Sequence, residues 1–276
     1  MVKFFQQFEP HGSGGPRIRE ISIRLLVPNF VTVMAICAGL TGVRLAYEGQ
    51  FERAVLMVLL AAFLDGIDGR LARALKATSK FGVQMDSLAD IVNFGVAPAL
   101  VLYFFLLQFA KPFGWIAALV YAVACCLRLA RFNVLTEDER QPDWQKEYFV
   151  GVPAPLGAAL VLLPVYLAFF GLERSTWLGW VAALFTILIA LLLVSRLPIY
   201  SGKKLKVGRD KAIPALLVAV MALLFLAFYT WQTLSILTLA YLAFIPLSAR
   251  AYSKRADMEE ANEAQLAAAA SSETSQ

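Results

Sequence analysis

The sequence has little charge, a single histidine and few cysteines. Asp, Glu, Lys and Arg make up only 16% of its 276 residues, whereas soluble domains contain about 25%. His11 lies in a polar N-terminal stretch, and Cys37, Cys125 and Cys126 fall in apolar runs without the spacing of a metal site or of a disulfide framework. This composition argues against histidine-based catalysis, against a zinc or copper centre, and against a disulfide-stabilised fold.

The sequence is instead rich in long apolar segments. Hydrophobic residues make up 59% of the chain, and the mean hydropathy is +0.66. A helix needs about 20 apolar residues to cross a bilayer. Segments of that length lie at roughly 25–46, 54–75, 84–108, 112–132, 152–171, 176–196, 212–230 and 232–249. The predicted fold class is therefore all-α, a polytopic membrane helical bundle of about eight transmembrane helices.

The basic residues are distributed unevenly between the two sides of this topology. Of the 25 Lys and Arg residues, only Arg44, Arg53, Lys111 and Arg174 fall on the side opposite the N-terminus. The positive-inside rule then predicts a multi-pass protein of the cytoplasmic (inner) membrane with both termini in the cytoplasm. The same distribution explains the net charge of +5 without a nucleic-acid partner.

Four aspartates stand inside or against the apolar runs, and they are the strongest functional signal. Asp65 and Asp68 lie late in the second predicted helix, and Asp86 and Asp90 lie early in the third. Carboxylates at bilayer depth are costly and usually functional. The i,i+3 and i,i+4 spacings place each pair on one helix face. Four neighbouring carboxylates need a cation to stay ionised together, and an all-oxygen site suits Mg²⁺ or Mn²⁺.

Two other roles are compatible with carboxylates in a membrane helix. They can be structural partners of a nearby arginine such as Arg70 or Arg73, or they can relay ions in a cation transporter. Transporters often repeat such residues in matching halves. Here all four aspartates lie in one helical hairpin, and the last four predicted helices carry nothing similar.

The residues beside the aspartates favour a diphosphate ligand. Gly69 and Ala72 leave one face of the helix bare, so that a ligand can approach the backbone. Arg73 lies one turn beyond Gly69, where its guanidinium can bind a phosphate. Carboxylates for a metal, a bare helix face and an arginine together indicate a diphosphate site.

At this point the chain resembles a known family. The pattern Asp65-x2-Asp68-Gly69-x2-Ala72-Arg73-x8-Gly82-x3-Asp86-x3-Asp90 resembles the signature of the CDP-alcohol phosphotransferases at all eight fixed positions. The resemblance implies a six-helix membrane core plus two helices, a homodimer, and transfer of a phosphatidyl-type group from a CDP-linked lipid to an alcohol with release of CMP. It also implies that the first three aspartates bind two divalent metal ions, and that Asp90 contacts metal and acts as the base.

Within this family the chain is most similar to bacterial integral-membrane enzymes that use L-serine as the acceptor. The similarity lies in the stretches 28–32, 81–98, 127–133 and 151–155. It implies that CDP-diacylglycerol and L-serine are the substrates and that phosphatidylserine is the product. Glycerol 3-phosphate, inositol phosphate and choline are the alternative acceptors.

The resemblance indicates residues that bind the donor lipid, and position and charge indicate residues for the acceptor. The predicted CDP-diacylglycerol site consists of Asn29, Thr32, Gly69, Ala72, Arg73, Ser79 and Gly82. An interhelical hydrogen bond for the first two and a helix cap for Ser79 are alternative roles. For the acceptor, a carboxylate needs a cation, and Arg128 and Arg131 are the candidates; anchoring at the membrane surface is their alternative role.

Three parts are therefore expected along the chain. A cytoplasmic N-terminal segment covers 1–23, a transmembrane catalytic domain in contact with membrane lipids covers 24–250, and a cytoplasmic tail, partly disordered, covers 251–276.

Overall fold

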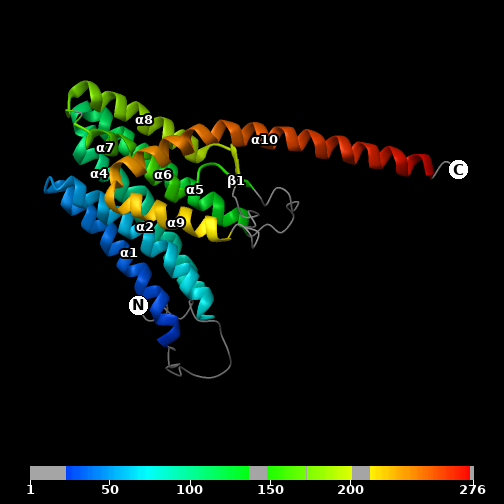
Figure 1. The fold of residues 1–276 in the computed structure, drawn as a ribbon, viewed down its shortest axis with the longest axis horizontal. Helices are drawn as coiled ribbons and strands as arrows, with labels where there is room; N and C mark the ends of the chain where they lie inside the picture. Colours follow the sequence, from blue (N-terminus) through cyan, green and yellow to red (C-terminus); the bar gives the residue numbers. More distant parts are fainter. Residues whose placement is uncertain (1–22, 137–147, 172, 201–211, 274–276) are drawn as a thin grey trace, which may run out of the picture.

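The protein is a bundle of helices, as a computed structural model shows for residues 23–136, 148–171, 173–200 and 212–273 (Figure 1). The helices are α1 (Ile23–Tyr47), α2 (Phe51–Ala74), α3 (Lys80–Asp90), α4 (Ala97–Phe105), α5 (Pro112–Thr136), α6 (Ala154–Val161), α7 (Leu163–Ala168), α8 (Thr176–Val194), α9 (Ala212–Phe228) and α10 (Thr230–Glu273). This confirms the predicted all-α bundle. The expected N-terminal segment lies almost entirely outside the described residues.

Five of the described helical segments are long and apolar enough to cross a membrane. They cover 26–47, 80–105, 112–134, 176–194 and 230–252, while 154–168 and 213–228 are apolar but shorter. The second predicted span corresponds to α2, whose last turns carry the two aspartates and two arginines. The multi-pass helical architecture is thus confirmed, and the number of eight spans stays a prediction.

The third span is one long rod with a π-helical turn in its middle. The turn covers Ile91–Val96, and the N–H of Ala97 bonds to the carbonyl five residues back, at Val92. Pro98 follows and has no N–H to offer the carbonyl of Phe94. The hydroxyl of Tyr121 on α5 donates to that carbonyl instead, at 2.9 Å. The helix therefore changes from α-helical to π-helical geometry directly after Asp90, and the carbonyl of Phe94 connects it to α5.

The hydrophobic core lies where α4, α5, α6 and α8 meet. Its largest fully buried side chains include Tyr121, Tyr166, Phe94 and Leu102. The α6–α7 unit breaks at Leu162, two residues before Pro164, a position where proline disfavours a continuous helix. A short antiparallel ribbon, β1 (Tyr148–Val150) with β2 (Pro198–Tyr200), closes one end of this region.

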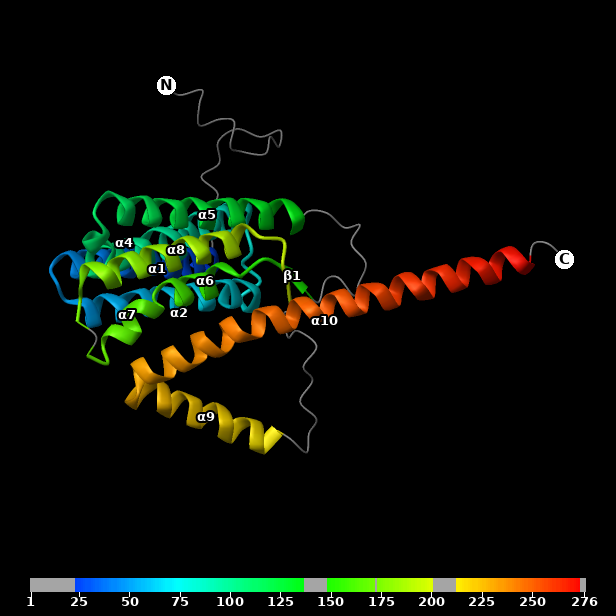
Figure 2. The same ribbon diagram turned by 90° about the horizontal axis from the view of Figure 1, so that it is seen from above.

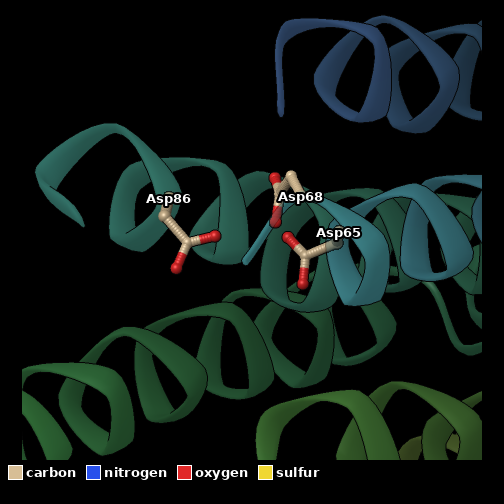
Figure 3. A group of neighbouring side chains, drawn as sticks. All are labelled: Asp65, Asp68 and Asp86. Atoms are coloured by element: carbon tan, nitrogen blue, oxygen red, sulfur yellow. The ribbon is translucent and has the colours of Figure 1, made fainter. Parts of the chain in front are cut away.

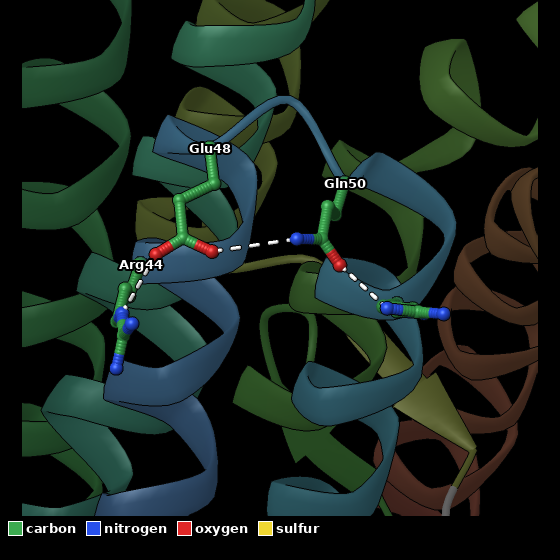
Figure 4. A network of polar contacts seen from close by, with 4 residues as sticks. Arg44, Glu48 and Gln50 are labelled. Carbon is green, nitrogen blue, oxygen red and sulfur yellow. Dashed lines mark hydrogen bonds and ion pairs between the residues drawn. The ribbon is translucent and has the colours of Figure 1, made fainter.

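At the opposite end, polar side chains order the turn between α1 and α2 (Figure 4). Glu48 accepts hydrogen bonds from Arg44 and from Gln50, and Arg53 donates to Gln50. This turn places α2 antiparallel to α1, along which it packs. The two aspartates of α2 are thereby brought back beside the start of α1.

The helix α9 and the second half of α10 stand away from the bundle, whereas the first half of α10 packs against α6 and α7. Figure 2 shows α9 standing away from the other helices, next to the first half of α10. In both views α10 extends well past the bundle, and it continues without a break to Glu273. Most of the predicted tail is therefore helical, and its disordered part stays a prediction.

Candidate active site

Three of the four predicted aspartates converge at the junction of α2 and α3. Figure 3 shows Asp65, Asp68 and Asp86 pointing toward one another. One carboxylate oxygen from each lies within 4.8 Å of the other two. Asp68 is only 2% exposed, and one buried oxygen each of Asp65 and Asp68 has no hydrogen-bond partner. Three converging carboxylates, two of them with a buried and unpartnered oxygen, are what a divalent cation would bind, so the donor set fits Mg²⁺ or Mn²⁺.

Asp90 is the fourth carboxylate and lies one turn further along α3. Its side chain is not within the compact group of three, but it is close enough to Asp65 to share a hydrogen bond. Two carboxylates in such contact repel unless a proton or a cation lies between them. The structure thus brings all four aspartates to one place, and it gives Asp90 a peripheral position beside Asp65.

Thr32 on α1 holds one of these carboxylates in place. Its hydroxyl lies 2.6 Å from Oδ2 of Asp68 and 3.2 Å from the carbonyl of Pro28 one turn earlier. A hydrogen bond to one oxygen of a metal-binding carboxylate orients the other oxygen. The interhelical hydrogen bond considered for Thr32 is therefore present, and it holds a carboxylate of the aspartate cluster.

All seven residues predicted to bind CDP-diacylglycerol line a single cavity of about 120 Å³. The cavity lies between α1, α2 and α3, and Asp68 and Asp86 form part of its wall. Arg73 lies close enough to Asp86 for the two side chains to interact electrostatically. The guanidinium of Arg73 and two carboxylates of the aspartate cluster therefore border the same space. This suits an anionic ligand that Arg73 binds directly and that the carboxylates would bind through a divalent cation.

A side chain at position 82 would crowd the wall of this cavity. A Cβ there would lie 3.1 Å from Oδ1 of Asn29 and 3.1 Å from Oγ of Ser79. Ser79 also begins α3, since its hydroxyl accepts from the N–H of Gly82 at 2.9 Å. The helix-cap role considered for Ser79 is thus present beside its place in the cavity wall.

The cavity includes four residues that the sequence did not indicate. They are Pro28, Ala77, Thr78 and Val83. Thr78 is the polar one among them, and it precedes Ser79 in the loop between α2 and α3. In the sequence, only its position could have indicated Thr78. With Ser79 it forms a pair of hydroxyl side chains between the basic end of α2 and the start of α3, which carries Asp86.

The two candidate arginines have different surroundings. Arg131 donates to the carbonyls of Leu193, Val194 and Ser195 at the end of α8 and to that of Val150 in β1, at 2.8–3.3 Å. Gly151 allows this approach: its φ is +79°, and a Cβ would lie 2.9 Å from Nη2 of Arg131. The guanidinium of Arg131 therefore caps α8 and anchors β1.

Arg128 has no such partners. It is only 8% exposed, its guanidinium lies 5.2 Å above the ring of Phe132, and it interacts electrostatically with Asp90. Within the part of the chain that the structure describes, no hydrogen bond or ion pair satisfies it. A buried cation that makes no hydrogen bond or ion pair is costly, so Arg128 is the better placed of the two to receive an anionic ligand.

Comparison with known proteins identifies the family. The model of the CDP-alcohol phosphatidyltransferase family matches residues 25–188, which include the whole aspartate cluster and both arginines. The chain belongs to this family. Divalent metal ions are generally used by CDP-alcohol phosphatidyltransferases, in agreement with the three converging carboxylates.

Individual relatives of this CDP-alcohol phosphatidyltransferase carry more specific names. The CDP-diacylglycerol–serine O-phosphatidyltransferase of Mycobacterium leprae is 46% identical over 213 residues, covering 75% of this chain and 68% of the relative. The enzyme of the same name from Helicobacter pylori is 37% identical, covering 66% and 74%. The archaetidylserine synthase of Methanothermobacter thermautotrophicus is 33% identical, covering 64% and 70%.

Proposed function

We propose that this CDP-alcohol phosphatidyltransferase transfers the phosphatidyl group of CDP-diacylglycerol to the hydroxyl of L-serine, giving phosphatidylserine and CMP. The observation that carries the proposal is the single cavity in which the predicted nucleotide-lipid residues border Asp68 and Asp86. The names of the relatives support serine as the acceptor. Family membership favours this reaction over the cation transport that the aspartates alone would also permit.

The donor lipid binds with its diphosphate between Arg73 and the aspartate cluster. Arg73 neutralises part of the diphosphate charge, and the bare surface of Gly69 and Ala72 lets the ligand approach α2. Ser79 and Asn29 also line the cavity, both beside Gly82, where they can hold the nucleotide. The acyl chains stay in the bilayer throughout, because the cavity lies among membrane helices.

Asp65, Asp68, Asp86 and Asp90 would hold two Mg²⁺ or Mn²⁺ ions. When bound, the ions neutralise the diphosphate and stabilise the CMP leaving group. Thr32 fixes the orientation of Asp68 for this purpose. The two-ion arrangement rests on the family resemblance, and the cluster of three carboxylates supports at least one such ion.

Asp90 accepts the proton in the transfer step. The serine oxygen forms a bond to the phosphorus that bears the diacylglycerol, its proton passes to the Asp90 carboxylate, and the bond from that phosphorus to the bridging oxygen breaks. CMP leaves with the bridging oxygen. The position of Asp90 at the edge of the cluster, facing Arg128, supports this role, since a base must reach the acceptor as well as the metal site.

The acceptor is bound through its carboxylate by Arg128. One buried guanidinium matches the single negative charge of a carboxylate, whereas a phosphorylated acceptor would favour several basic residues. Arg131 already donates to four carbonyls, so its role is to hold the end of α8 and β1 and not to contact the acceptor. Serine fits this arrangement better than glycerol 3-phosphate, inositol phosphate or choline.

We further propose that the site opens to the cytoplasm from the inner membrane. The support is the excess of Lys and Arg in the loops on the side of the aspartates. Both substrates are then accessible, since the nucleotide lipid lies in the membrane and serine in the cytoplasm. The homodimer implied by the family resemblance stays a prediction.

The direct test is an acceptor assay with the purified protein in vesicles that contain CDP-diacylglycerol and Mg²⁺. CMP release should depend on L-serine and should be low with glycerol 3-phosphate, inositol phosphate or choline. CMP release with one of these alcohols and not with serine would keep the family reaction and refute the acceptor. No release with any of the alcohols would refute the reaction itself.

A further inference from the structure

The buried face of α10 carries a polar group whose role the family reaction does not explain. Tyr241 packs against the hydrophobic core, and its hydroxyl oxygen is buried without a hydrogen-bond partner. A buried hydroxyl that makes no hydrogen bond is destabilising. Tyr241 also lies outside residues 25–188, which the family model matches. Its unpartnered hydroxyl is the kind of group that a ligand satisfies.

A charged group near Tyr241 indicates the chemistry of a ligand that suits this place. The guanidinium of Arg128 on α5 interacts electrostatically with the hydroxyl of Tyr241. Arg128 in turn faces Asp90 on α3. Three helices thus contribute a hydroxyl donor, a buried cation and the proposed base to one region. Among the described residues the hydroxyl makes no hydrogen bond and the guanidinium makes no hydrogen bond or ion pair, and both suit a carboxylate oxygen.

We propose that the hydroxyl of Tyr241 donates a hydrogen bond to the acceptor carboxylate held by Arg128, so that α10 takes part in choosing the acceptor. This rests on the proposed transfer to serine. The carboxylate lies between Tyr241 and Arg128, and the acceptor hydroxyl points to Asp90. The binding of an acceptor that lacks a carboxylate gains nothing from Tyr241, and such an acceptor leaves both buried groups unsatisfied.

The experiment uses Tyr241→Phe, which removes the hydroxyl and keeps the ring. A hydrogen bond to a charged group is lost, so the KM for serine should rise about tenfold or more. The KM for CDP-diacylglycerol and the melting temperature should stay close to those of the wild type. Serinamide, which keeps the hydroxyl and the amine but not the carboxylate, should be used equally poorly by the variant and the wild type.

Tyr166→Phe is the matched control. Tyr166 on α7 is fully buried and its hydroxyl also lacks a partner, but it does not interact with Arg128. This change should leave the KM for serine unaltered. If Tyr241→Phe has the same small effect as Tyr166→Phe, or if it lowers the use of serine and serinamide equally, the proposed role of Tyr241 is wrong. The proposed function fails separately, if wild-type protein releases no CMP with serine.

Discussion

Replacing Arg131 by methionine separates the structural arginine from the acceptor-binding one. The change keeps the apolar stem and removes four hydrogen bonds to the carbonyls of Leu193, Val194, Ser195 and Val150. The last carbonyls of a helix have no partner within it. Because the guanidinium is partly exposed, each bond contributes about 1 kcal/mol or less. The expected loss of unfolding free energy is therefore about 2–4 kcal/mol.

The loss can be measured as a shift in melting temperature. At about 2–4 °C for each kcal/mol, the purified variant in detergent should melt about 5–15 °C below the wild type, followed by tryptophan fluorescence. Below that temperature, its KM for serine should stay within about twofold of the wild-type value, because the acceptor contact belongs to Arg128. Arg196→Met is the control, since Arg196 is exposed at the same end of α8 and makes no such bonds among the described residues.

Gly151→Ala tests the same contact from the other side. The added Cβ would lie 2.9 Å from Nη2 of Arg131 and 2.8 Å from the carbonyl of Ser195, at a φ of +79° that alanine rarely adopts. If both variants act on one contact, the double variant should melt little below the worse of the two. An Arg131→Met protein with wild-type melting and a raised KM for serine would refute this reasoning and return Arg131 to the acceptor site.

Three further outcomes are expected. A chelator should abolish activity and Mg²⁺ or Mn²⁺ should restore it; full activity after thorough chelation would remove the metal from the site. Asp90→Asn should lower turnover by at least about 100-fold and leave CDP-diacylglycerol binding largely intact, whereas near-normal turnover would exclude Asp90 as the base. Thr32→Val should raise the Mg²⁺ concentration for half-maximal activity about tenfold through its lost bond to Asp68, and an unchanged requirement would show that this bond does not orient the ligand.

The fold class and the aspartate site follow from local patterns. Apolar runs of bilayer length predict helices without any knowledge of their neighbours. The spacing of the four aspartates, Asp65, Asp68, Asp86 and Asp90, determines which of them share a helix face. The family resemblance predicts that Asn29 and Thr32 belong to this site. The packing of α1 on α2 explains why they line the cavity. Breaks such as the π-helical turn before Pro98 also have a local cause, although sequence alone did not locate that turn.

The roles of the two arginines and of Tyr241 depend on tertiary structure. Arg128 and Arg131 are three residues apart on one helix, and the sequence treats them alike. Their roles differ because Arg131 meets carbonyls up to 64 residues away in the chain, at the end of α8, whereas Arg128 faces Asp90 and α10. Tyr241 lies in an apolar span like many other aromatic residues. Only the packing of α10 brings its hydroxyl to Arg128, because contacts between distant helices are decided by how their faces fit and not by local spacing.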